Sequence, residues 1–220
     1  KSGRAGKGIK AAASHTGAMA SEDAVYDAAF ERTGIARVFD LGDVFDCAAL
    51  VGRSRMPHGP RLGIVTNAGG PGVVATDALV AAGGELATLA PATLAALDDC
   101  LPPAWSHGNP VDVLGDAGSR RLEKAVEAVL ADPGVDALLV ILTPQAMTNP
   151  TGAAKVLARL AEKSPKPVLA AWLGGQAMRE GAGILAEAGV AAYQTPEQAV
   201  RAFMTLVAYA RNLEILYETP

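Results

Sequence analysis

Residues Asp136–Leu142 read DALLVIL, one acidic residue followed by an uninterrupted apolar run. Such a run is typical of a strand buried on both faces, as in a parallel sheet covered by helices on both sides. Residues Pro167–Leu173, PVLAAWL, form a second run of the same kind. A helix of about a dozen residues is expected between them, from Pro150, and another after them, over Gln176–Ala188. Strands that alternate with helices predict βαβ units and a parallel sheet.

The same alternation extends outward on both sides of these two runs. Ser119–Ala131 has apolar residues at i, i+3, i+4, i+7 and i+8, which predicts an amphipathic helix. Further helices are expected over Pro71–Ala82, over Ala92–Asp99 and after a capping box that begins at Thr195. We therefore predict an α/β, doubly wound, flavodoxin-like parallel sheet with strand order 2-1-3-4-5. Its strands are Arg61–Thr66, Glu85–Leu89, Asp136–Leu142, Pro167–Leu173 and Val190–Gln194.

The first 60 residues have a different character. Residues 1–20 are rich in Gly and Ala and are expected to form a long loop. A helix capped by Ser21 and ended by Gly34 follows, and then a short strand at Val38 and Phe39. Gly52–Pro60, GRSRMPHGP, is the best linker candidate. Between the short strand and this linker, Leu41–Val51 is expected to be a helix. Its buried face is expected to carry Leu41, Val44, Phe45 and Ala48.

Composition narrows the class of protein. Half of the 220 residues are hydrophobic and 19% are charged, which indicates a folded chain. The net charge is −4, without a basic stripe, and aromatic residues make up 5%, so nucleic acid is not expected as a partner. Two cysteines, Cys47 and Cys100, do not form a disulfide framework, which favours a reducing, cytoplasmic location. No apolar stretch reaches about 18 residues, so we expect no membrane span. Lys1 in place of Met suggests a segment of a longer protein.

Ligands of open α/β sheets bind beyond the carboxyl ends of the strands. After the first strand, Thr66–Ala75 reads TNAGGPGVVA and contains the pattern G-x-G-x-x-A. A nicotinamide site would need an acidic residue near the end of the next strand, which instead reads Thr88-Leu89-Ala90. No Lys follows Gly72, so this is not a P-loop. The pattern predicts anion binding by backbone N–H groups at a helix terminus; the alternative is a tight turn whose glycines serve packing only.

Other side-chain chemistry gives weaker signals. His15 lies in the loop sequence SHTGA, and a lone loop histidine is more often a solvated residue. The three histidines are far apart and no C-x-x-C is present, so no metal site is expected. No G-x-S-x-G is present, and neither cysteine has an obvious base beside it.

Several segments together resemble one enzyme family. Ala11–Ser21, AAASHTGAMAS, followed by Ala24–Phe30, AVYDAAF, resembles the phosphohistidine segment of NDP-forming acyl-CoA synthetases, which are relatives of succinyl-CoA synthetase. Thr66–Leu79 resembles the glycine-headed helix of that superfamily. Gly108–Gly115, GNPVDVLG, and Leu142–Met147, LTPQAM, resemble segments that border its site.

The resemblance implies a role for individual residues. His15 matches the histidine that is phosphorylated, in a loop whose glycines allow movement between two sites. In such enzymes acyl-CoA and phosphate give acyl phosphate and CoA, and the phosphoryl group then passes through histidine to ADP. Asp112, Gln145 and His107 are expected to line the site. The residues expected to hold the phosphate are Asn67, Ala68, Gly69, Gly70 and Gly72.

The resemblance also implies partners. Residues 1–51 would be the tail of a preceding flavodoxin-like domain, 52–60 a linker and 61–220 the flavodoxin-like CoA-ligase domain. A CoA-binding domain is expected before Lys1 and an ATP-grasp domain after Pro220. The whole enzyme would use CoA, ATP or ADP, Mg²⁺ and a small carboxylic acid, of which this segment holds none tightly except phosphate. The acid, and the choice between ADP and GDP, stay open.

Two alternatives remain at this point. A synthetase-like regulatory region is also fused to a GNAT domain in protein lysine acetyltransferases, many of which lack the histidine. The presence of His15 favours the enzyme. The other alternative is a ligand-binding or interaction module without chemistry.

Overall fold

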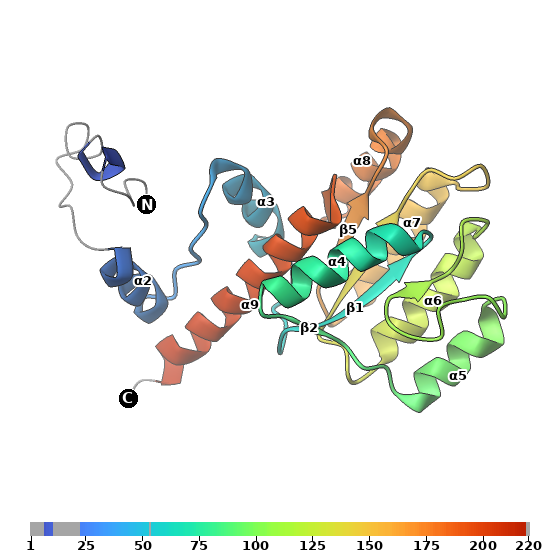
Figure 1. Cartoon of the computed structure of the whole chain (residues 1–220), viewed down its shortest axis with the longest axis horizontal. Helices are drawn as coiled ribbons and strands as arrows, with labels where there is room; N and C mark the ends of the chain where they lie inside the picture. The colour runs from blue at the N-terminus through green and yellow to red at the C-terminus, as the bar shows by residue number, and fades with distance from the viewer. Residues whose placement is uncertain (1–6, 11–22, 53, 219–220) are drawn as a thin grey trace.

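The computed structural model describes residues 7–10, 23–52 and 54–218 (Figure 1). Its centre is a parallel sheet with the strand order β2-β1-β4-β5-β6, and β3 also pairs with β1. This confirms the predicted order, in which the run at Ala137–Leu142 lies inside the sheet between β1 and β5. The strands are β1 (Arg61–Thr66), β2 (Glu85–Leu86), β3 (Val111–Asp112), β4 (Ala137–Leu142), β5 (Val168–Trp172) and β6 (Ala191–Tyr193).

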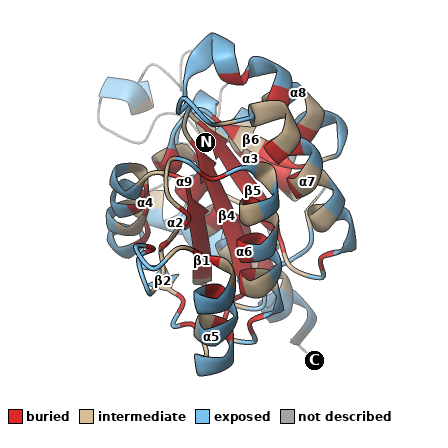
Figure 2. Ribbon diagram, turned by 90° about the vertical axis from the view of Figure 1, so that its right-hand side faces the viewer, coloured by how far each residue is buried: buried red, intermediate tan, exposed pale blue. Residues whose placement is uncertain are grey.

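Helices cover both faces of the sheet, and the central strands are buried between them (Figure 2). Every residue of β4 is buried, as its continuous apolar sequence predicts. One face packs against α5 (Pro91–Cys100), α6 (Ser119–Ala131), α7 (Pro150–Lys163) and α8 (Arg179–Glu187). The other face packs against α4 (Gly69–Ala81) and α9 (Pro196–Glu218). A short 3₁₀ turn, η1 (Gly175–Met178), precedes α8.

The strand expected over Glu85–Leu89 is wrong in length, because β2 ends at Leu86. The cause is Asn109, whose side-chain amide occupies the edge of β1 beyond that point. Its Nδ2 donates to the carbonyl oxygens of Leu62 (2.9 Å) and Ala87 (2.8 Å). The two-residue strand β3, which the periodicity of the sequence does not predict, then pairs with the last residues of β1.

The described part before the linker holds α2 (Asp23–Arg32) and α3 (Leu41–Val51) and adds no strand to the sheet. Residues 7–10 are also helical, so the loop expected over residues 1–20 is wrong there. The helix over Leu41–Val51 is confirmed as α3. One side of it packs on β6 and α9. On this side Tyr193 Oη of β6 donates to the carbonyl of Asp46 (3.0 Å). The strand at Val38 and Phe39 is wrong: both residues lie in an irregular segment, and Phe39 packs on the Arg37 guanidinium. The expected cap Ser21 lies outside the described residues.

The buried face of α3 also differs from the prediction. Leu41 and Phe45 are 77% and 74% exposed, whereas Cys47 and Leu50 are buried. Val44 and Ala48 are exposed with the first pair, because both faces of this helix are apolar and α9 covers only the one that carries Leu50. An apolar surface is therefore left open on α3.

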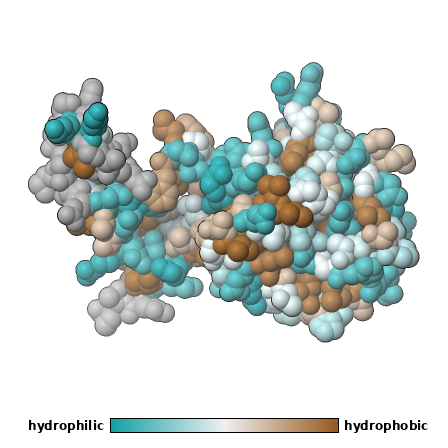
Figure 3. Space-filling model, viewed as in Figure 1, coloured by the Kyte–Doolittle hydropathy of each residue, from teal (hydrophilic) through white to brown (hydrophobic). Residues whose placement is uncertain are grey.

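A second open apolar surface lies on α4. Val73 and Val80 are 59% and 63% exposed, and Val74 is also exposed. Figure 3 shows hydrophobic side chains gathered over the part of the molecule where α4 lies. Among the described residues, no helix has the length and apolar character that a membrane crossing requires.

Candidate functional site

The candidate site lies at the carboxyl edge of the sheet, between β1 and β4. From β1 the chain turns one way to β2, and it later adds β4 on the other side, so the crossovers diverge here. This is the topological switch point at which doubly wound sheets bind ligands. The loops after β1, β3 and β4 meet at this edge, and the loop after β1 leads directly into α4.

The first turn of α4 presents two open backbone donors. Ala68 is the N-cap residue, and no side chain caps the helix there. The N–H of Ala68 is already satisfied by Thr66 Oγ1 (3.0 Å). First-turn N–H groups have no partner within a helix, and Pro71 has none to offer. The open donors are therefore the N–H groups of Gly69 and Gly70, both of which are exposed.

Gly70 and Gly72 have different surroundings. A Cβ added at Gly70 would meet no atom within 4 Å. A Cβ added at Gly72 would lie 3.3 Å from both Pro110 Cβ and Thr66 Cγ2, and Gly72 is buried. Gly72 therefore allows α4 to pack closely on β1 and on the segment before β3. Gly70 faces the space in which an anion would approach.

Asn67 does not offer its side chain to a ligand. It is 2% exposed. Its Oδ1 accepts from the backbone N–H of Thr143 (2.8 Å), and its Nδ2 donates to the carbonyl of Thr143 (2.9 Å). Five residues were predicted to hold phosphate, and three of them have another role. The Asn67 side chain bonds to the loop after β4, Ala68 is the N-cap of α4, and Gly72 lets α4 pack on β1. The backbone N–H groups of Gly69 and Gly70 remain as donors for a ligand.

Asp112 lies beside the start of α4. Strand β3 pairs Asp112 with Thr66, the last residue of β1. Asp112 Oδ2 lies 3.2 Å from the position of a Cβ built on Gly69, and Oδ1 accepts from the N–H of Leu114 (2.9 Å). The positive end of the helix dipole stabilises the carboxylate of Asp112, but this carboxylate repels a phosphate that approaches the same helix terminus.

Gln145 belongs to the same edge. It is exposed in the loop after β4, and its Nε2 donates to Thr143 Oγ1 (3.2 Å). Its side chain also lies against Gly115, where an added Cβ would meet Gln145 Cδ at 3.3 Å. Gln145 therefore connects the loop after β4 with the loop after β3.

The histidines are placed differently from one another. His107 has both ring nitrogens engaged, Nδ1 with Asp98 Oδ1 (3.1 Å) and Nε2 with the carbonyl of Pro103 (2.9 Å). Its ring also packs on Trp105, so its contacts are with α5 and the loop after it. His15 lies outside the described residues. Within the described ranges, no group of three or more His, Cys, Asp or Glu residues is arranged to hold a metal.

Two residues that position the site were missed by the sequence analysis. Asn109 Oδ1 accepts from the N–H of Ile64 (2.9 Å), so this amide continues the ladder of β1 toward the site. Arg121 of α6 donates to the carbonyl of Val113 (3.1 Å) and to Asp116 Oδ1 (2.6 Å), which lowers the pKa of Asp116. Arg121 stands in none of the segments that carry the resemblance. Asn109 lies in one of them, Gly108–Gly115, but the resemblance gave this residue no role.

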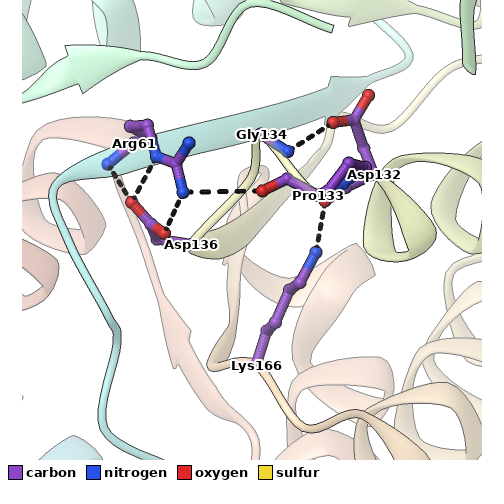
Figure 4. A network of polar contacts seen from close by, with 6 residues as sticks. All are labelled: Arg61, Asp132, Pro133, Gly134, Asp136 and Lys166. Carbon is purple, nitrogen blue, oxygen red and sulfur yellow. Dashed lines mark hydrogen bonds and ion pairs between the residues drawn. The ribbon is translucent and has the colours of Figure 1, made fainter. Parts of the chain in front are cut away.

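A polar network of another kind lies at the opposite, amino edge of the sheet (Figure 4). Arg61 forms two side-chain hydrogen bonds with Asp136, of 2.9 and 2.7 Å, and they lower the pKa of that buried carboxyl. Burial raises the pKa of Asp132, but hydrogen bonds from Thr93 and from two backbone N–H groups outweigh it and leave a net lowering. Lys166 donates to the carbonyl of Asp132. This network stabilises the fold and lies far from the candidate site.

The larger cavities do not coincide with the start of α4. One of about 320 Å³ lies at the amino ends of β5 and β6, beside Lys166. Another of about 390 Å³ lies at the carboxyl ends of these strands, beside Gln176 and Arg179. A phosphate needs little room and few donors, so the open helix terminus, rather than cavity size, identifies the site.

Comparisons with known proteins agree with this architecture. A model of the Ligase-CoA domain matches residues 62–216, and a model of the succinyl-CoA ligase like flavodoxin domain matches residues 1–51. The chain therefore belongs to the Ligase-CoA domain family.

The relatives are ADP-forming ligases. The acetate–CoA ligase (ADP-forming) I subunit alpha of Pyrococcus furiosus is 36% identical over 96% of this chain and 46% of the relative. The 4-hydroxybutyrate–CoA ligase (ADP-forming) of Nitrosopumilus maritimus is 35% identical over 96% of this chain and 30% of the relative. The dinucleotide forming acetyl-coenzyme A synthetase 1 of Ca. Korarchaeum cryptofilum, solved in complex with phosphate and ADP, matches with a TM-score of 0.89 and 36% identity. That match covers 98% of this chain and 47% of the solved chain. The chain thus spans less than half the length of these relatives.

Proposed function

We propose that this chain is the part of an NDP-forming acyl-CoA synthetase that holds the phosphoryl group while it passes through His15. Acyl-CoA and phosphate give acyl phosphate and CoA. An imidazole nitrogen of His15 then takes the phosphoryl group and releases the acid, and ADP takes it from the histidine to form ATP. A neutral imidazole is a competent nucleophile near pH 7.

The observation that carries this proposal is the open end of α4. The N–H groups of Gly69 and Gly70 point from an uncapped helix terminus at the switch point of the sheet. The turn Thr66–Ala75 contains no Lys or Arg. A carrier site must release its phosphate again, and backbone dipoles bind it without a competing ammonium group. Phosphate in one solved relative is consistent with this chemistry.

The domain assignment is part of the proposal. We assign residues 1–51 to the tail of a preceding flavodoxin-like domain, 52–60 to a linker and 61–220 to the CoA-ligase domain. The two family matches support this division. The exposed apolar side chains of Phe45 on α3 and Val80 on α4 also support it, because large apolar side chains in a group are usually covered by a partner.

The remaining chemistry is assigned to other parts of the enzyme. The described residues fit a phosphate at Gly69 and Gly70. The turn lacks the Lys of a P-loop, and the segment Thr88-Leu89-Ala90 lacks the ribose-binding acid that a dinucleotide would need. CoA, ATP or ADP and Mg²⁺ would bind to a CoA-binding domain and an ATP-grasp domain in the same chain or a partner subunit. To Gln145 we assign a contact with the carboxylic acid, because it is exposed in the loop after β4 at the same edge of the sheet. A cytoplasmic location stays a prediction.

The two alternatives have less support. The relatives reported above are all named ligases or synthetases, which favours the enzyme over the regulatory region of an acetyltransferase. A module without chemistry would not need an uncapped helix terminus at the switch point of its sheet.

The test is phosphorylation of the full-length protein by ATP labelled in the γ-phosphoryl group. We expect an acid-labile, base-stable label, as a phosphorus–nitrogen bond gives, and its complete loss in His15→Ala. The matched control is His58→Ala, because His58 is an exposed linker histidine that should not affect the label. Labelling of His15→Ala at the wild-type stoichiometry would overturn the assignment.

A further inference from the structure

A polar cluster around the buried side chain of Asn67 joins the loop after β1 to the loop after β4. Its centre is the side-chain amide of Asn67, which exchanges two hydrogen bonds with the backbone of Thr143. Oδ1 also accepts from Thr143 Oγ1 (3.1 Å), and Nδ2 also donates to Thr148 Oγ1 (3.2 Å). An asparagine amide offers two donors and two acceptor positions, and all four are used here.

The cluster continues to Gln145, which we proposed above as a contact of the acid. Thr148 Oγ1 accepts from the N–H of Gln145 (3.1 Å) and donates to the carbonyl of Thr143 (3.3 Å). Gln145 Nε2 in turn donates to Thr143 Oγ1 (3.2 Å). The four residues Asn67, Thr143, Gln145 and Thr148 are called the loop clamp below. Every hydroxyl and amide group in it has a partner within it.

The loop clamp lies directly before the phosphate-holding turn. Asn67 is separated from Gly69 by a single residue, and the N–H of that residue is itself held by Thr66 Oγ1. The position of the Gly69 and Gly70 N–H groups is thus fixed by two sets of contacts. One set comes from Thr66 at the end of β1, and the other comes from the loop after β4 through Asn67. A fully satisfied buried network rigidifies its surroundings, whereas a partly satisfied one costs free energy.

We propose that Asn67 is a positioning residue that holds the N-terminus of α4 in a fixed place relative to the loop after β4. The N–H groups of Gly69 and Gly70 are then held in one geometry toward the phosphoryl group, as its transfer to His15 requires. The inference rests on the proposed function, and it assigns to Asn67 a role through its neighbours rather than a contact with phosphate. Misplacement by about 1 Å in such a site costs about 100-fold in rate.

The experiment compares two substitutions that remove buried polar contacts at opposite edges of the sheet of the full-length protein. Asn67→Ala releases the loop clamp, and the control Asp136→Asn weakens the network with Arg61 at the amino edge (Figure 4). Melting temperature and the rate of phosphoenzyme formation from labelled ATP are measured for both. We expect both to melt earlier, but only Asn67→Ala to label about 10- to 100-fold more slowly. Thr148→Val, which removes one hydroxyl, should show a smaller loss, and Thr148→Ser should restore the wild-type rate.

The outcomes separate this inference from the proposed function. Equal labelling rates for wild type and Asn67→Ala would overturn the positioning role and leave the phosphohistidine intact. Slow labelling of Asp136→Asn to the same degree would also overturn it, because the effect would follow general stability. Absence of label in the wild type would overturn both. If Asn67→Ala does not fold, the comparison of Thr148→Val with Thr148→Ser decides the question.

Discussion

The side-chain amide of Asn109 takes the place of a strand residue beside Ile64. Its Oδ1 accepts from the N–H of Ile64 (2.9 Å), while its Nδ2 donates to the carbonyl oxygens of Leu62 and Ala87 (2.9 and 2.8 Å). A side chain thus satisfies the edge of β1 where β2 has ended and β3 has not begun.

Loss of this amide should destabilise the fold. Asn109→Ala removes the partner of the Ile64 N–H and of the Ala87 carbonyl, whereas the carbonyl of Leu62 keeps its bond from the N–H of Ala87 (3.0 Å). Each buried group that loses its partner costs about 1–3 kcal/mol. We expect a loss of about 3 kcal/mol in urea unfolding of the 220-residue chain. The control is Asn149→Ala, which removes an N-cap bond to Gly152 at α7 and should cost about 1 kcal/mol. Equal losses for the two variants would contradict the role given to Asn109.

The ion pair of Arg61 and Asp136 should make the free energy of unfolding depend on pH in the acidic range. The hydrogen bonds from Arg61 lower the pKa of Asp136, so the folded state favours the carboxylate. The stabilisation is therefore present above the unfolded pKa of about 3.9 and is lost as pH falls through the lower, folded pKa.

Asp136→Asn tests this dependence. At pH 7 we expect the variant to be about 2 kcal/mol less stable, the range found for hydrogen bonds to charged groups. The difference from wild type should shrink as pH is lowered below about 4, since Asp136 then takes up a proton in the unfolded chain before it does so in the folded one. Urea unfolding at several pH values measures it. A difference that stays constant down to pH 2 would show that the charge of Asp136 is not involved.

The sequence predicts those parts of the fold that rest on local pattern. The continuous apolar run of β4 predicts a strand buried on both faces, and the regular spacing of Ser119–Ala131 predicts α6, and both are confirmed. The edge contact of Asn109 was not predictable, because its partner Ile64 is 45 positions away and a side chain performs a backbone role. The two residues of β3 are too short to show a period.

The same distinction applies to the site. The glycine turn after β1 predicts a helix terminus, and α4 begins there, because Gly and Pro have local conformational meaning. The turn could not say which residue binds and which packs. Gly72 is fixed by Pro110, and Asn67 by Thr143, and both partners are distant in sequence. On α3 both faces are apolar, so only the position of α9 decides which one is buried.

Substitutions at Gly70 and Gly72 should separate an effect on phosphate binding from an effect on the packing of α4. Gly70→Val adds a side chain where no atom lies within 4 Å, so stability should stay within about 0.5 kcal/mol of wild type. Its side chain stands where phosphate approaches, and phosphoenzyme formation in the full-length protein should slow by about 10²–10³-fold, as when one preorganised donor is lost. Gly72→Val instead meets Pro110 and Thr66 and should unfold earlier. Wild-type labelling by Gly70→Val would exclude this turn as the phosphate site.

Asp112 should weaken phosphate binding through its charge. Its carboxylate lies beside Gly69, where it repels an arriving anion. Asp112→Asn keeps an oxygen that accepts from Leu114 N–H and removes the charge. Since two unit charges about 4 Å apart in water interact by about 1 kcal/mol, we expect roughly fivefold tighter binding of inorganic phosphate by calorimetry. The gain should fall at high salt. Unchanged affinity at low salt would show that phosphate does not bind at this helix terminus.

The last prediction concerns the open face of α3. Phe45 is 74% exposed, whereas Leu50 on the same helix is 1% exposed and packs toward α9. If residues 1–51 are the tail of a preceding domain, the rest of that domain covers Phe45 in the full-length protein. Phe45→Glu should then leave the unfolding of the 220-residue chain unchanged but destabilise the full-length protein by about 2–3 kcal/mol, the cost of burying an unpaired polar group.

The matched control for that face is Leu50→Ala on the covered side. It should destabilise both the 220-residue chain and the full-length protein by about 2–5 kcal/mol, because its packing partners are within the described residues in each case. Urea unfolding is measured for Phe45→Glu and Leu50→Ala, each in the 220-residue chain and in the full-length protein. A full-length protein that tolerates Phe45→Glu as well as the shorter chain does would mean that α3 keeps an open apolar face, and the assignment of residues 1–51 to a preceding domain would fall with it.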